Sequence, residues 1–149
     1  MRSSNASRVL FANLVAQAAI IFTGAVVRIS GSGLGCPTWP ECVPGSFVPT
    51  AHQAQTWHKL VEFGNRTLTG LLLVLAVLAI GVVWRSQPTS RLRRLAVLPL
   101  MGTLLQAILG GITVLTGLHS VAVVAHFLVS VLLVWWSAQL WFEFRHGSL

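Results

Sequence analysis

The sequence predicts an all-α integral membrane protein that folds as a four-helix bundle. Of its 149 residues, 54% are hydrophobic and only 9% are charged, and its mean hydropathy is +0.77. Such a composition is typical of a chain whose solvent is lipid. Four apolar stretches each come close to the roughly 20 residues that a helix needs to cross the hydrocarbon. They cover residues 9–27, 60–84, 95–115 and 121–142, and we expect them to form one domain over residues 1–149.

The first stretch has some features of a cleaved signal peptide. Arg2 and Arg8 precede it, and small residues occur around Ala16 and Ala18. Its apolar run continues to residue 27, however, whereas the apolar region of a signal peptide is only about 7 to 15 residues long. We therefore expect the first stretch to be retained as a transmembrane helix.

The basic residues predict the orientation of the helices. Seven of the ten lie before the first stretch, between the second and third, or after the fourth: Arg2, Arg8, Arg85, Arg91, Arg93, Arg94 and Arg145. Under the positive-inside rule these segments are cytoplasmic, so both termini face the cytoplasm. The net charge of +7 then reflects membrane topology, and nucleic acid is not expected as a partner.

The connection between the first two stretches, at about 29–57, is long and rich in glycine and proline, and we expect it to be external. It contains both cysteines, Cys36 and Cys42. An external compartment permits disulfides, which favours a disulfide between them. A zinc site that includes His52 and a redox-active pair stay open as alternatives. A structured loop of this length in so small a protein usually has a function.

The second stretch begins with polar residues that share one helix face. At about 100° per residue, a single narrow stripe contains His58, Glu62, Asn65 and Thr69. Ionisable groups at the margin of the hydrocarbon are functional candidates, because they are costly unless paired or used. The alternative is that Glu62 only forms an ion pair with Arg66 at the i, i+4 spacing.

The fourth stretch contains His126 near its external end, with Ser130 and Ser137 on the same face and His119 upstream. An imidazole here could be an axial ligand of heme iron, since one ring nitrogen binds the metal while the other fixes the ring. It could instead be a hydrogen-bond partner between helices. The second and fourth helices run in the same direction, so their polar residues lie at the same depth and a flat cofactor could fit between them.

Several motifs together resemble the heme A synthase family over nearly the whole chain. The motifs are GAVVR at 24–28, GSGLGCPTWPEC at 31–42, EFGNR at 62–66, GGITVLTG at 110–117 and AHF at 125–127. The resemblance implies an enzyme of the bacterial plasma membrane that oxidises the C8 methyl group of heme O to the formyl group of heme A, for cytochrome oxidase. It also implies oxygen derived from water, a heme b cofactor beside the heme substrate, and histidine ligands on the second and fourth helices.

Carried over residue by residue, the resemblance makes His126 an iron ligand and Glu62 the catalytic acid. Cys36 and Cys42 match the family's loop cysteines. We expect Arg66 to hold a heme propionate through a bidentate contact. Two further residues are expected to line the heme pocket, Asn65 and Arg28.

The chain departs from the family pattern in two ways. Position 65, where the pattern Glu-x-x-His-Arg has an iron ligand, is Asn65, so His58 two turns earlier is expected to replace it. The chain also has one four-helix half where most members have two, and it matches the first, substrate-side half. A homodimer, or a second four-helix half from a partner, would rebuild the full arrangement, and a heme O synthase is a further expected partner.

Two other functions stay open. The chain could be a non-catalytic heme b module for electron transfer in the membrane, which needs His126 but neither Glu62 nor the cysteines. It could also be a small dimeric transporter that uses Glu62 as a proton site. The long cysteine-containing connection argues against a transporter.

Overall fold

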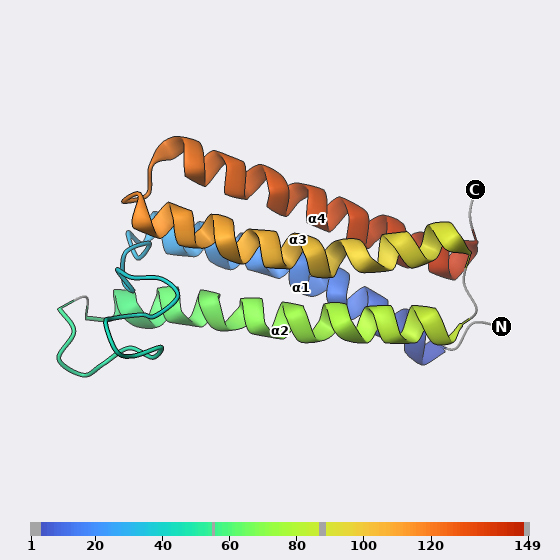
Figure 1. The fold of residues 1–149 in the computed structure, drawn as a ribbon, viewed down its shortest axis with the longest axis horizontal. Coiled ribbons are helices and arrows are strands. Elements are labelled where there is room, and N and C mark those ends of the chain that lie inside the picture. Colours follow the sequence, from blue (N-terminus) through green and yellow to red (C-terminus); the bar gives the residue numbers. More distant parts are fainter. Residues whose placement is uncertain (1–3, 55, 87–88, 148–149) are drawn as a thin grey trace.

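The computed structural model describes residues 4–54, 56–86 and 89–147, and its four helices confirm the predicted membrane bundle. The helices are α1 (Ser4–Ile29), α2 (His58–Arg85), α3 (Ser90–Leu115) and α4 (Ser120–His146), as Figure 1 shows. Each is long and apolar enough to cross a membrane. Within these ranges the structure has no β-strand, only an isolated bridge between Val43 and Ser46.

Helix α3 begins earlier than the sequence predicts. We expected a basic loop over residues 85–94, but α2 continues to Arg85 and α3 already begins at Ser90. Thr89 caps α3, because its side chain accepts a hydrogen bond from the backbone N–H of Leu92 at 3.3 Å. An apolar stretch ends where charged residues begin, but a helix can extend past that point into the interfacial region of the membrane. The arginines that follow Ser90 are therefore part of α3.

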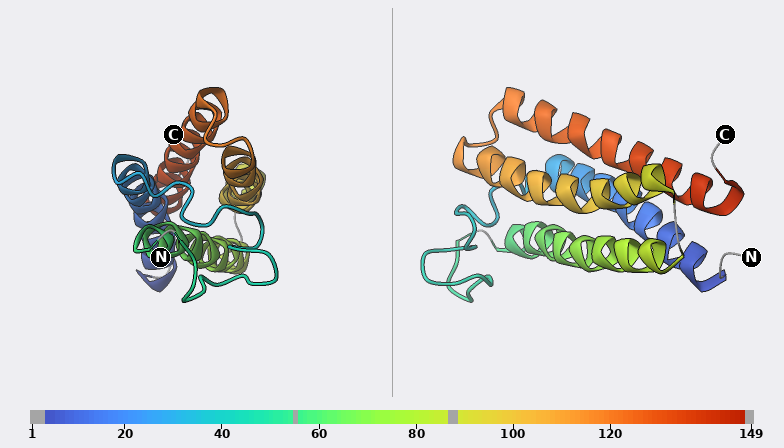
Figure 2. Two further views of the ribbon diagram at one scale, coloured as in Figure 1. Left: turned by 90° about the vertical axis from the view of Figure 1, so that its left-hand side faces the viewer. Right: turned by 45° about the vertical axis from the view of Figure 1, so that its right-hand side comes forward.

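Each helix contacts the helices next to it in the sequence, and α1 also contacts α4, so the four helices form a ring. Helices α2 and α4 therefore occupy diagonal positions, as the end-on view in Figure 2 shows. We call the end with the α1–α2 connection the loop end. The opposite end, where α1 begins and α4 ends, is the terminal end (Figure 1).

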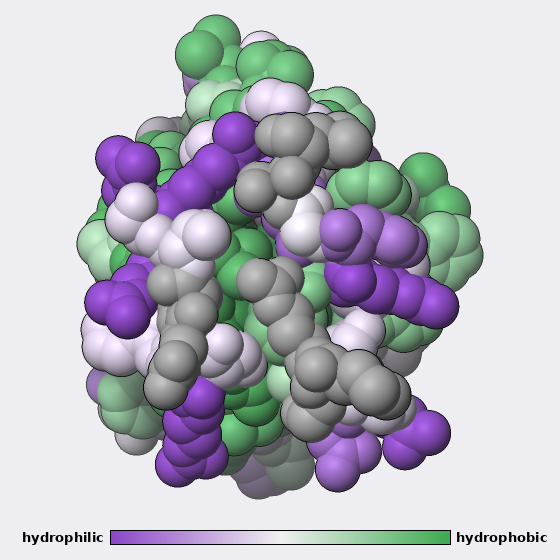
Figure 3. Space-filling view, turned by 90° about the vertical axis from the view of Figure 1, so that its right-hand side faces the viewer, coloured by the Kyte–Doolittle hydropathy of each residue, from purple (hydrophilic) through white to green (hydrophobic). Residues whose placement is uncertain are grey.

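The terminal end carries six of the seven arginines used to predict orientation. Arg2 lies outside the described residues. Arg91 of α3 forms an ion pair with Glu143 of α4 at 2.6 Å, between the guanidinium and the carboxylate. Figure 3 looks onto this end and shows hydrophilic side chains around an apolar centre. This arrangement is compatible with a cytoplasmic terminal end, which stays a prediction.

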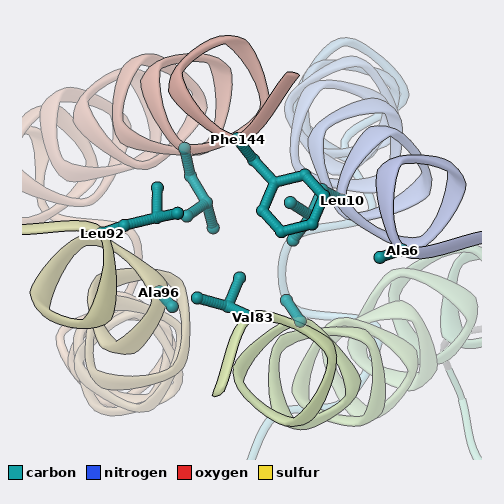
Figure 4. Packing of buried hydrophobic residues seen from close by; sticks show 8 residues of the cluster. Ala6, Leu10, Val83, Leu92, Ala96 and Phe144 are labelled. Carbon is teal, nitrogen blue, oxygen red and sulfur yellow. The ribbon is translucent and has the colours of Figure 1, made fainter. Parts of the chain in front are cut away.

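The best-packed part of the bundle lies in its terminal half. Eight buried residues from all four helices form a cluster that we call the terminal cluster: Ala6, Leu10, Ala79, Val83, Leu92, Ala96, Leu140 and Phe144. Figure 4 shows the Phe144 ring of α4 beside Leu10 of α1. Small alanines on α2 and α3 allow the helices to approach closely, and their packing closes the centre of the bundle at this end.

The loop half is packed less tightly. On α1 the last buried residue is Gln17, and on α4 the first is Leu133. The described residues 18–29 of α1 and 120–132 of α4 therefore contribute no buried side chain. Helix α3 does bury Gly111, Thr113 and Val114 in this half, so the looser packing is confined to α1 and α4. Side chains of these two helices can therefore face a ligand there.

Candidate functional site

The first turn of α2 is in direct contact with the α1–α2 connection. This connection runs over residues 30–57, and Cys36 and Cys42 are joined in a disulfide, as expected. The bond uses both thiols, so they are not available as zinc ligands. Gly35 lies against the backbone of α2, and a Cβ atom at this position would overlap the His58 carbonyl group. Only glycine allows so close an approach.

Glu62 joins α2 to this connection through its carboxylate. The residue is buried, with 5% of its surface exposed. Its Oε2 atom accepts a hydrogen bond from the backbone N–H of Cys36 at 2.8 Å, and its Oε1 atom forms an ion pair with Arg66 at 2.6 Å. A buried carboxylate is stable only when paired and hydrogen-bonded, and here both oxygens have partners.

Arg66 uses all of its hydrogen-bond donors within the protein. A guanidinium group has five N–H bonds. Two point at Oε1 of Glu62, and the other three donate to backbone carbonyls of the connection at Cys36 (2.7 Å), Thr38 (3.0 Å) and Glu41 (3.3 Å). The predicted i, i+4 pair therefore exists, but it also fixes the disulfide segment to α2. A heme propionate could bind Arg66 only by displacing one of these acceptors.

His58 is the first residue of α2 and is half-buried. Its Nδ1 atom lies 2.9 Å from the Ser32 hydroxyl oxygen, and its ring stacks on Trp57 with 4.0 Å between the ring centroids. A second ring nitrogen held by a hydrogen bond is the usual arrangement of a histidine ligand to a metal. The surroundings of His58 are thus compatible with its predicted ligand role, which stays a prediction.

The other predicted pocket residues on α1 and α2 differ in their surroundings. The Asn65 side-chain carbonyl accepts a hydrogen bond from the Thr23 hydroxyl of α1 at 2.7 Å. This bond ties the two helices together near the loop end. Arg28, in the last turn of α1, is exposed.

His126 lies on α4 in the loosely packed half and faces α3. Its ring is next to Gly110, where a Cβ atom would lie 3.5 Å from the ring carbon Cε1. The backbone carbonyl of His126 accepts a hydrogen bond from the Gln106 amide at 2.9 Å, which fixes this turn of α4. The ring atom Nδ1 is buried and has no hydrogen-bond partner among the residues that the structure describes. An imidazole with an unsatisfied buried nitrogen is suited to a metal ligand.

The α1–α2 connection also reaches α3. Trp39 packs flat against Gly111, where a Cβ atom would lie 2.5 Å from Cδ2 of the indole. Sequence reasoning identified Gly111 as part of a motif but did not identify its partner. It also missed Gln53, whose side-chain amide donates to the Gly35 carbonyl and lies 3.9 Å from the Cys42 sulfur. The connection is therefore a folded cap over the loop ends of α2 and α3.

The site thus consists of two sets of side chains on diagonal helices at the loop end. His58 and Glu62 lie on α2 under the cap, and His126 lies on α4. In this half the described residues of α1 and α4 contribute no buried side chain. Histidine side chains in the loop half suit a heme, whose iron takes axial histidine ligands. The fold and the site together define a multi-pass membrane protein with a candidate heme site between helices.

Comparison with known proteins gives the family. The chain matches the family of cytochrome oxidase assembly proteins over residues 7–147, and it belongs to that family. Relatives named heme A synthase include proteins of Bacillus pumilus (34% identity over 117 residues) and Symbiobacterium thermophilum (35% over 126 residues). These alignments cover 76% and 83% of this chain but only 36% and 40% of the relatives. The resemblance found in the motifs is confirmed, and the chain spans about two fifths or less of the relatives' length.

Proposed function

We propose that this chain acts in heme A synthesis as a four-helix unit that binds heme O and oxidises its C8 methyl group to a formyl group. The observation that carries the proposal is the unpaired, buried Nδ1 atom of His126 in the loosely packed half of the bundle. The similarity to proteins named heme A synthase supports the same reaction. In this proposal His126 and His58 hold the heme iron from opposite helices.

Glu62 has the proton-handling role in this proposal. Conversion of a methyl to a formyl group takes up oxygen from water and releases protons, and a carboxylate near the reacting carbon can accept them. The Cys36 N–H group and Arg66 hold this carboxylate in one position. Electrons pass to an acceptor outside this chain. Heme b, where it is bound, supplies redox chemistry through its iron.

The connection at 30–57 positions Glu62 in this proposal. Three backbone carbonyls of the disulfide segment accept hydrogen bonds from Arg66, and Arg66 in turn binds Glu62. A purely electron-transferring heme b module needs no such arrangement around an acid. This network therefore favours the enzyme over the alternative module.

The remaining parts of the proposal concern the assembly. Because the chain covers little more than a third of relatives such as the Bacillus pumilus protein, we propose that two copies, or one copy and a second four-helix unit, form the active enzyme. A heme O synthase delivers the substrate. The loop end faces the outside of a bacterial plasma membrane, as the arginine distribution predicts.

The test is to express the chain beside a heme O synthase in cells that lack heme A, and to separate the extracted hemes by chromatography. Heme A would support a complete enzyme, and its loss in the Glu62→Gln variant would assign the reaction to this site. Bound heme O without heme A would indicate a substrate-binding unit that needs a second half. Bound heme b alone would favour the electron-transfer module, and absence of any heme would overturn the site.

A further inference from the structure

Six polar side chains line the inside of the bundle below the candidate site, and the proposed reaction assigns no chemical step to them. We call them the polar seam: Asn13, Gln17, Thr103, Gln106, Ser130 and Ser137. Four of them, Asn13, Gln17, Thr103 and Ser137, have at most 2% of their surface exposed. Polar groups inside a membrane bundle are costly unless they are satisfied, so such a line of them calls for a physical reason.

The seam consists of three layers that cross between helices. In the first layer the Gln106 amide donates to the carbonyl of His126 at 2.9 Å and to the Ser130 hydroxyl. In the second, the amide of Gln17 on α1 donates to the Thr103 hydroxyl on α3 at 3.1 Å. In the third, the amide of Asn13 donates to the Ser137 hydroxyl at 3.2 Å.

The layers follow one another from the loop end towards the terminal end. His126 and Ser137 are eleven residues apart on α4, which is about 16 Å at 1.5 Å per residue. Beyond the third layer lie the apolar side chains of the terminal cluster, because Leu10 and Leu140 are about one turn from Asn13 and Ser137 on their helices. The seam therefore begins in the loosely packed half and ends at the terminal cluster.

Two buried atoms of the seam, Oδ1 of Asn13 and Oε1 of Gln106, have no hydrogen-bond partner among the described residues, and neither does the neighbouring Nδ1 of His126. The amides of Asn13 and Gln106 each use their nitrogen for a bond to another helix and leave their carbonyl oxygen unpaired. Exchanging the oxygen and nitrogen of either amide would leave an N–H group unpaired instead. Either orientation of the Asn13 and Gln106 amides therefore leaves one hydrogen bond unmade. A small molecule that both donates and accepts hydrogen bonds would supply it.

We propose that the polar seam binds a chain of water molecules that enters from the loop end and stops at the terminal cluster. Buried waters typically make about three hydrogen bonds to polar groups that the protein leaves unsatisfied. The orphaned carbonyls of Asn13 and Gln106 are such groups, at the two ends of the seam. The terminal cluster prevents the chain from crossing the bundle. This proposal does not depend on the heme reaction.

The test uses single cysteines in the full chain in lipid nanodiscs, observed by infrared spectroscopy after transfer to D2O. The native Cys36 and Cys42 form a disulfide and contribute no S–H band. Ser137→Cys and Thr103→Cys place a thiol in the seam. Ala79→Cys places one in the terminal cluster, and Leu105→Cys places one on the outer face of α3, where Leu105 is 46% exposed.

We expect the S–H band of both seam thiols to be lost rapidly by exchange to S–D, while both control thiols keep it. Slow exchange at the seam positions would overturn the proposal, because the polar residues would then only bind the helices together. Rapid exchange at Ala79→Cys as well would also overturn it, since water would then enter the whole bundle. Rapid exchange at Thr103→Cys with slow exchange at Ser137→Cys would contradict the proposal that the water chain reaches the third layer.

A variant that blocks the middle layer tests whether water enters the seam from the loop end. In the Ser137→Cys background, Gln17→Leu replaces the polar side chain of the middle layer by an apolar one. We expect this change to preserve the S–H band at position 137. Val15→Leu on the same helix is the matched control, because Val15 is 48% exposed on the outer face, and it should leave the exchange rapid. Equal exchange in the two variants would contradict entry from the loop end.

Discussion

Phe144 and Leu10 are almost completely buried in the terminal half of the bundle, whereas residues 120–132 of α4 contain no buried side chain in the loop half. In the terminal half the four helices contact one another directly through apolar side chains. In the loop half, polar groups and the disulfide cap supply many of the contacts instead. The packing that holds the helices together and the candidate site therefore lie at opposite ends of the same four helices.

The division has a physical basis. Direct helix packing leaves no room for a flat ligand, so a bundle that binds one must separate its helices over part of their length. The lost packing has to be offset elsewhere. Here the terminal cluster holds the helices at one end, and Arg66 and the disulfide hold the cap at the other.

The largest effect is expected for Glu62→Gln in the loop half. The amide keeps an oxygen that can accept the Cys36 N–H bond, but it cannot take up a proton at physiological pH. General acid and base groups contribute about 10²- to 10⁴-fold to rates, so heme A yield per bound heme should fall by at least about 100-fold. Heme extraction and chromatography measure this yield.

The nearby Glu41→Gln variant is the matched control, because within the described ranges the Glu41 carboxylate accepts a hydrogen bond only from the exposed Gly45 N–H group. Its yield should match that of the unmodified chain. Normal heme A yield from Glu62→Gln would reject the proton role, and loss of bound heme from this variant would assign Glu62 to binding instead.

The second effect concerns the terminal half. Phe144→Ala leaves a cavity in the terminal cluster, and truncation of a buried phenylalanine costs about 3 kcal/mol or more in the free energy of unfolding. Denaturant titration of the chain in mixed micelles measures this change. Phe142→Ala on the same helix is the control, since Phe142 is 43% exposed. Equal destabilisation by the two substitutions would contradict the assignment of stability to the terminal cluster.

The same contrast explains which features could be predicted from the sequence. The four spans depend on local composition, and they were predicted from apolar stretches alone. The Glu62–Arg66 pair depends on helical spacing, and it too was predicted. The backbone acceptors of Arg66 and the contact of Trp39 with Gly111 depend on the path of a loop, which no periodicity encodes. Gln106 lies in an apolar stretch, and its polarity there was the signal that was not used.

The smallest of the three effects is expected for Arg66→Lys in the loop half. Arg66→Lys keeps the charge that pairs with Glu62 but reduces five donors to three on a flexible stem, so the carbonyls of Cys36, Thr38 and Glu41 cannot all be satisfied. Loss of hydrogen bonds from a charged donor costs about 1.5 to 3 kcal/mol each at most, and water at the cap will offset much of it.

We expect the disulfide to be reduced about tenfold faster by a water-soluble phosphine, which corresponds to about 1.4 kcal/mol of lost protection. Arg28→Lys, at an exposed position on α1, is the control and should not change the rate. If Arg66→Lys left the reduction rate unchanged while heme binding fell, Arg66 would act on the heme propionate, as the sequence alone suggested, and the cap would be held by other contacts.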